Sequence, residues 1–121
     1  MPRSQQITHN GKIIFHMDFT NLNNVQEIKS LINESVAHIR KQPQNSLLTL
    51  TNIEGMHFSN EIKDLFGDFI KGNKPYVKAG AVVGLSGLQQ ILYNGLMKIT
   101  GRDIKSFGSI NEAKDWLVSK N

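Results

Sequence analysis

The feature that most constrains the fold is an alternation of two hydrophobic patterns along most of the chain. From residue 23 onward, stretches with an apolar residue every three or four positions alternate with short apolar runs. The first pattern is typical of helices with one buried face, and the second of buried strands. Strands that alternate with helices form parallel sheets, in which the crossover connections are right-handed. The pattern therefore predicts an α/β protein.

A β-hairpin is expected before this alternation begins, over residues 5–19, because two strand patterns flank Asn10-Gly11. The predicted order is then β-β-α-β-α-β-α-β-α. Helices are expected over 23–43, 58–75, 86–101 and 109–120, and the intervening strands over 46–52, 77–84 and 103–107. We thus predict one domain, residues 1–121, with a mixed, mostly parallel five-stranded sheet, an N-terminal hairpin and four helices.

Side chains that can cap a helix stand at the expected helix starts. Asn24 and Ser59 are preferred N-cap residues, and Ser109 with Glu112 has capping-box spacing. In the third helix, we expect the following residues to face the core: Leu88, Ile91, Leu92, Leu96 and Ile99.

Composition excludes several classes of site. The 121 residues include no cysteine, so disulfides, thiolate nucleophiles and cysteine-based zinc sites are excluded. No apolar stretch approaches the ~20 residues of a membrane-spanning helix, and the first ten residues lack the apolar core of a signal peptide. We therefore expect a cytoplasmic protein that is not transmembrane.

The net charge of +4 does not by itself indicate nucleic-acid binding. Lysines and arginines are scattered, with loose clusters at Lys71/Lys74/Lys78 and Lys98/Arg102/Lys105. Aromatic residues do not alternate with them as a single-strand platform requires. Nucleic acid is therefore not an expected partner.

Three segments carry a family resemblance, namely "LLTLTNIEGMHFSNEI", "KPYVKAGAVVGLSGLQQIL" and "IKSFGSINEAKDWL". They resemble the STAS domain superfamily, and more closely its SpoIIAA-like branch of small stand-alone proteins. With the order of elements, the resemblance covers nearly the whole chain. It implies a SpoIIAA-like fold and either a regulatory role through protein contacts or an apolar-ligand or membrane-associated role.

The resemblance also marks Ser59 as a candidate phosphorylation site. In anti-sigma-factor antagonists, a serine at the start of the corresponding helix is phosphorylated, and the added charge breaks a protein complex. Phe58 stands where that family has an aspartate. The chain itself offers an alternative, because serine at this place is an ordinary N-cap.

The segment "AVVGLSGLQQ", residues 81–90, permits three interpretations. A hydrolase elbow requires G-x-S-x-G with a later histidine, but the second glycine here comes one residue early and all four histidines precede Ser86. A phosphate or other anion could bind the backbone N–H groups around Gly84, Ser86 and Gly87. The favoured interpretation is a capping box between Ser86 and Gln89 after a tight turn at Gly84.

His16 and Asp18 share one face of the second strand and form a second candidate for chemistry. They could act as a base and the carboxylate that orients it, or as part of a metal site, although no third ligand has suitable spacing. A polar sheet face is the simpler interpretation.

A large apolar set lies on the second and third expected helices and their leading loops. Its members are Phe58, Phe66, Phe69, Tyr76, Leu85, Leu92, Tyr93 and Met97. Most are expected in the core, but exposed members would line a hydrophobic groove.

We predict a non-enzymatic regulatory or binding module that acts through protein–protein contacts, from the loops around Ser59 and Ser86. Open α/β sheets place ligands at this carboxyl edge. The alternatives are an apolar-ligand or peripheral membrane module, and a small enzyme that uses Ser86 or His16/Asp18. No metal or cofactor is predicted. Several helices on one sheet face would leave the other thinly covered, which favours a homodimer.

Overall fold

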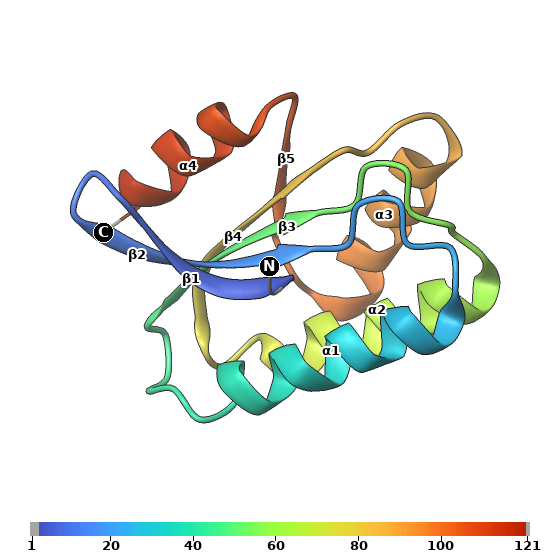
Figure 1. The fold of residues 1–121 in the computed structure, drawn as a ribbon, viewed down its shortest axis with the longest axis horizontal. Helices are drawn as coiled ribbons and strands as arrows, with labels where there is room; N and C mark the ends of the chain where they lie inside the picture. Colours follow the sequence, from blue (N-terminus) through green and yellow to red (C-terminus); the bar gives the residue numbers. More distant parts are fainter. Residues whose placement is uncertain (1–2, 121) are drawn as a thin grey trace.

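The protein forms a five-stranded sheet with four helices in the predicted order, shown in the computed structural model of Figure 1, which describes residues 3–120. The strands are β1 (Ser4–His9), β2 (Lys12–Asp18), β3 (Leu47–Asn52), β4 (Val77–Val83) and β5 (Lys105–Phe107). The helices are α1 (Val25–Ile39), α2 (Asn60–Asn73), α3 (Leu88–Thr100) and α4 (Ile110–Val118). The predicted fold class is confirmed.

The strands lie in the sheet in the order in which they occur in the chain. β1 and β2 form the antiparallel hairpin, with His9 opposite Lys12, and the remaining neighbours are parallel. Asn10 and Gly11 have φ values of 49° and 80°, as the predicted type I′ turn requires.

This strand order determines where the helices lie. Each crossover advances one strand in the same direction, so right-handed connections place α1, α2 and α3 on one face. α4 comes after the last strand and covers the opposite face, as Figure 1 shows. The sheet therefore has three helices on one side and a single helix on the other.

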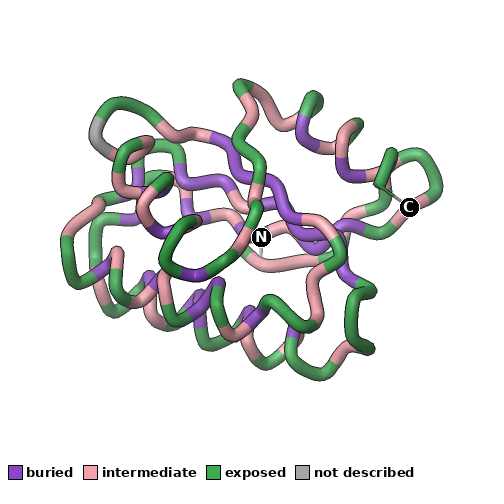
Figure 2. The backbone as a smooth tube through the Cα atoms, turned by 180° about the vertical axis from the view of Figure 1, so that it is seen from behind, coloured by how far each residue is buried: buried purple, intermediate pink, exposed green. Residues whose placement is uncertain are grey.

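Two apolar cores result from this arrangement. The larger, between the sheet and α1–α3, includes Phe15, Met17 and Phe66. The smaller includes Ile14 and Leu50 from the sheet and Leu117 from α4. Because successive strand residues point to opposite faces, neighbouring Ile14 and Phe15 belong to different cores. Figure 2 shows buried residues along the strands and on the inner sides of the helices.

The face predicted for α3 is partly wrong. Ile91 and Ile99 are 68% and 76% exposed, whereas Tyr93 and Leu96 are buried. Leu92 is half-buried, and the side chain of Leu88 lies outside the part of the chain that the structure describes.

The sequence of α3 contains two overlapping apolar stripes, and packing against α2 selects between them. Gly67 of α2 lies so close to α3 that a Cβ there would be 3.3 Å from a methyl carbon of Leu96. This contact turns the side of α3 that carries Tyr93 and Leu96 inward, and Thr100 is buried with them.

Substitutions on the two sides of α3 test this assignment. We expect Leu96→Ala to lower the free energy of unfolding by about 2–4 kcal/mol, because it leaves a cavity in the larger core. Ile91→Gln and Ile99→Gln should each change it by less than ~0.5 kcal/mol. Urea denaturation measures all three, and a large loss at residue 91 or 99 would contradict the assignment.

Candidate functional site at the carboxyl edge of the sheet

The loops after β2, β3 and β4 meet at the carboxyl edge of the sheet. Backbone hydrogen bonds join the first two loops, and the Ile53 N–H of the second donates to the Val83 carbonyl at the end of β4 at 3.0 Å. The Asn21 N–H donates to the Glu54 carbonyl at 2.9 Å, and the His57 N–H donates to the Leu22 carbonyl at 2.8 Å. Asn21 and Gly55 have positive φ, and a Cβ on Gly55 would collide with the Asn21 side chain. The loops therefore form one rigid surface, which we call the carboxyl-edge surface (residues 19–24, 53–60 and 84–87).

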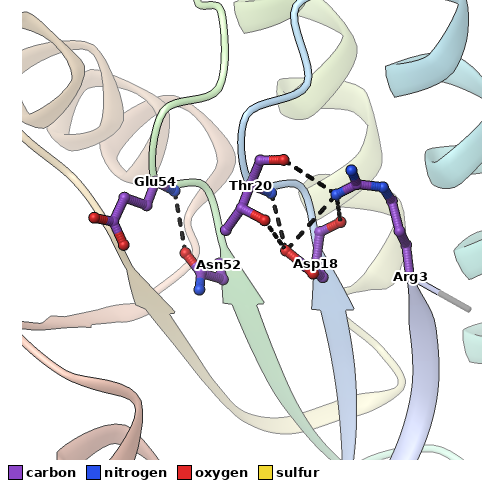
Figure 3. A network of polar contacts seen from close by, with 5 residues as sticks. All are labelled: Arg3, Asp18, Thr20, Asn52 and Glu54. Atoms are coloured by element: carbon purple, nitrogen blue, oxygen red, sulfur yellow. Dashed lines mark hydrogen bonds and ion pairs between the residues drawn. The ribbon is translucent and has the colours of Figure 1, made fainter. Parts of the chain in front are cut away.

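Polar side chains fix the strand ends beneath this surface (Figure 3). The Asp18 carboxylate accepts hydrogen bonds from the Thr20 N–H at 3.0 Å and the Thr20 hydroxyl at 2.6 Å. The Arg3 guanidinium donates to the carbonyls of Asp18 and Thr20. On the next strand, the Asn52 side chain accepts from the Glu54 N–H at 3.1 Å. Each strand end is thus closed by a local turn.

The surroundings of Asp18 keep it ionised. Burial alone would raise the pKa of its carboxyl group, but the two hydrogen bonds from Thr20 and the positive charge of Arg3 outweigh it, so the pKa is lowered. This carboxylate therefore closes a turn at the end of β2.

His16 is not hydrogen-bonded to Asp18, so the two do not form a base and its orienting group here. His16 lies on the α4 side of the sheet, and its Nε2 atom is buried without a hydrogen-bond partner. Burial lowers the pKa of His16, with Asp18 opposing the shift and Lys114 adding to it. Within residues 3–120, no three His, Asp or Glu side chains group as metal ligands would.

The predicted capping box at Ser86 is wrong. Gly87 is the N-cap of α3, and no side chain caps this helix start. The Gln89 N–H instead donates to the Ser86 carbonyl, and the Gln89 side chain donates to the Met56 carbonyl at 3.1 Å. The Gln89 side chain thus bonds to the distant Met56 instead of forming a capping box with Ser86, and Ser86 is exposed.

The tight turn predicted at Gly84 is confirmed. Its φ of +92° is unfavourable for other residues, and a Cβ there would lie 2.7 Å from the Glu54 Cα atom. Gly87 also has positive φ, but no atom lies within 4 Å of its Cβ position.

A shallow cavity of about 320 Å³ opens beside this turn. Its lining includes Gly84, Ser86, Asn52, Glu54 and Ser109. The last three were not predicted as site residues. Asn52 is the last residue of β3 and Ser109 is the N-cap of α4, and both positions can be recognised from the sequence pattern. Glu54 lies within a loop and has no such pattern.

Ser59 and Phe58 lie beside, and not within, that cavity. Ser59 is the N-cap of α2, as predicted, and its hydroxyl accepts from the Ile62 N–H at 3.3 Å. Phe58 is half-buried and packs against the larger core. The structure therefore separates two positions on the carboxyl-edge surface, one around Ser59 and one around Ser86.

The apolar set on α2, α3 and their leading loops belongs mainly to the larger core. Phe66, Phe69 and Tyr93 are buried, and the remaining members that pack against them are partly buried, namely Phe58, Tyr76, Leu85 and Met97. These side chains fill the space between the two helices and the sheet.

Comparison with known proteins supports the fold. No family model and no curated protein matches the chain. It is similar to the crystal structure of an uncharacterised protein of the DUF3478 family with a SpoIIAA-like fold, from Shewanella loihica PV-4. The identity is 19% and the TM-score 0.60, over 94% of this chain and 91% of that one.

The class is therefore that of small α/β proteins with a SpoIIAA-like fold, as the sequence resemblance implied. The similarity identifies the fold and gives no activity. Within residues 3–120, no helix is both long enough and apolar enough to cross a membrane.

Alanine substitutions at two glycines test the rigidity of the carboxyl-edge surface. Gly87→Ala should cost roughly 1–3 kcal/mol, because a φ of 51° with a ψ of −122° is disfavoured for alanine, although no atom obstructs the added Cβ. Gly84→Ala adds a collision with the Glu54 backbone and should cost on the order of 3 kcal/mol or more. Thermal unfolding of the two variants measures the difference, and equal losses would contradict the close packing at Gly84.

The burial of His16 predicts a pH dependence of stability. Because its folded-state pKa is lowered from 6.5, protonation favours the unfolded chain. The contribution of neutral His16 to the free energy of unfolding is therefore complete above the unfolded-state pKa, and it is lost as pH falls through the folded-state pKa. The slope from this group is at most ~1.4 kcal/mol per pH unit.

His16→Leu should flatten the dependence of unfolding free energy on pH below 6.5, measured by urea denaturation at several pH values. His57→Leu, at an exposed histidine, is the control. An unchanged slope in His16→Leu would show that His16 does not cause the loss.

Proposed function

We propose that this protein is a non-enzymatic binding module that contacts a protein partner through the carboxyl-edge surface. The observation that supports the proposal best is the rigidity of this surface. Backbone hydrogen bonds join the loops after β2 and β3 to each other, and the second of these loops to the end of β4, so the exposed groups of these loops are held in place before any partner arrives. Pre-organisation of this kind reduces the entropic cost of association.

The chemical character of the surface also favours a protein partner. Its exposed residues are mainly polar, and they include Asn21, Glu54, His57, Asn60 and Ser86. Protein interfaces of the non-obligate class have polar rims and many hydrogen bonds. The apolar side chains near this edge point into the larger core instead.

Ser59 is the position from which such contacts would be regulated. Its half-buried hydroxyl lies at the N-terminus of α2, between exposed His57 and Asn60. A phosphate there would add a charge of about −1.5 to −2 where the helix dipole tolerates it, so the fold would persist while the surface changed its charge.

The alternative roles have weaker support. Buried aromatic side chains fill the inner space between α2 and α3, and the outer cavity of about 400 Å³ between these helices is lined by charged side chains that include Lys63, Asp64 and Asp68. An enzyme based on His16 and Asp18 would need a hydrogen bond between them. The Asp18 carboxylate instead accepts a hydrogen bond from Thr20 and forms an ion pair with Arg3. The homodimer stays a prediction. It was expected because one face of the sheet would be thinly covered, and α4 packs against that face.

Charge at Ser59 is the direct test. A photo-crosslinking residue in place of exposed His57 should give a discrete adduct with a protein in cells, and the same residue in place of Gln44, at the opposite edge, should not. Ser59→Asp should reduce the adduct by about tenfold or more, because an introduced charge disfavours a complementary interface.

Ser59→Asn is the matched control, because Asn and Asp both cap helices and only Asp adds charge. It should leave the adduct unchanged. Circular dichroism establishes that both variants are folded. An adduct that persists in Ser59→Asp, or forms only from position 44, would contradict the proposal.

A further inference from the structure

A second cavity, of about 590 Å³, lies at the opposite end of the sheet, beside the amino end of β4. Its floor is the first half of β4, and its walls come from the segment after α3 and from the end of α4. It shares no lining residue with the carboxyl-edge cavity.

The cavity exists because β5 is short. β5 pairs only with Ala81, Val82 and Val83, so residues 77–80 of β4 extend beyond it and have no strand on that side. A β-bulge occurs in the same half of β4, where Leu47 pairs with Val77 and Leu48 with Ala79, leaving Lys78 as the extra residue. Bulges redirect side chains and are frequent beside functional sites.

The lining is strongly positive. It contains Lys74, Lys78, Arg102 and Lys120, opposed by one carboxylate, that of Asp103, so the formal excess is three positive charges. Within residues 3–120, the ion pairs join Arg3 to Asp18 and His9 to Asp115, so none involves these four cations.

Arg102 is the most constrained of the four. It is half-buried, and its guanidinium donates to the Ile70 carbonyl at 2.5 Å, which leaves further N–H donors. Burial lowers the pKa of Arg102, which reflects the cost of holding a cation there without a counter-charge.

Helix dipoles do not account for this excess. α2, α3 and α4 all end near the cavity, and each helix end contributes about half a negative charge. Some of these carbonyls are already bonded, since Thr100 donates to Leu96 and the Lys120 N–H donates to Leu117. Roughly one and a half positive charges therefore remain uncompensated.

We propose that this cavity binds the phosphate group of a small phosphorylated ligand. Its volume is within the range of small-molecule sites. A carboxylate would neutralise one charge only, whereas a phosphate or pyrophosphate matches the larger excess and accepts several hydrogen bonds. The inference does not depend on the proposed function at the carboxyl edge.

Trp116 provides a direct readout. It lines the cavity, it is the single tryptophan of the chain, and the Lys120 ammonium lies 4.9 Å from its ring centroid. An anion that draws Lys120 away from the ring will change the tryptophan emission.

The test is a titration of the protein with sodium pyrophosphate, monitored by tryptophan fluorescence. We expect a saturable change that added NaCl weakens. The double variant Lys74→Gln/Lys78→Gln should raise the apparent Kd by about fivefold or more. Both lysines are exposed, so the fold should be retained.

Lys29→Gln/Lys63→Gln removes the same charge outside the cavity and should leave the apparent Kd unchanged. An absent or non-saturable response of the wild-type protein, or equal Kd values in the two double variants, would overturn the proposal. Binding of a single-stranded oligonucleotide without binding of pyrophosphate would overturn it in favour of a nucleic-acid surface.

The phosphate group could belong to a lipid headgroup or to a free small molecule. Vesicles that contain phosphatidic acid distinguish these two sources. If they bind through Lys74 and Lys78 more tightly than pyrophosphate does, the phosphate belongs to a lipid headgroup. If pyrophosphate binds and the vesicles do not, the ligand is a free phosphorylated molecule. Either result supports a phosphate site in this cavity.

Discussion

The handedness of the β–α–β crossovers is the constraint on which the rest of the structure depends. Since the strands occur in the sheet in chain order, three right-handed crossovers place three helices on one face. The other face must then be covered by the segment after the last strand, and α4 fulfils this role with Ala113 and Leu117 buried. The same geometry brings the three strand-to-helix loops to one edge, where backbone hydrogen bonds join the loops after β2 and β3 and link the latter to the end of β4.

Features governed by neighbours in the chain could be predicted from the sequence. The hairpin turn depends on Asn10 and Gly11 themselves, and the caps at Asn24, Ser59 and Ser109 depend on residues two or three positions away. Contacts between distant segments could not be predicted. The inward face of α3 is selected by Gly67 of α2, and the side chain of Gln89 bonds to Met56 instead of capping its own helix.

The same distinction applies to the two cavities. Gly84 and Ser86 were recognisable because a strand ends and a helix begins there. The basic cavity was not, because Lys74 and Lys78 belong to one loose cluster, Arg102 to another and Lys120 to neither, and the four meet only in the folded protein. The scatter of basic residues along the chain, which argued against nucleic-acid binding, does not describe how these four residues lie in the folded molecule.

The two unequal cores have a consequence for local motion. α4 closes the smaller core alone and is joined to the hairpin by the pair His9–Asp115, whose Nε2 and Oδ1 atoms are 2.8 Å apart. Elements with few buried contacts can open locally, as separate cooperative units, at a lower free-energy cost than global unfolding. α4 buries only Ala113 and Leu117, so we expect its amides to exchange with solvent faster than those of β3 and β4, while the larger core remains closed. His16 lies beneath α4, so mild acid should favour this partly opened form before it favours the unfolded chain.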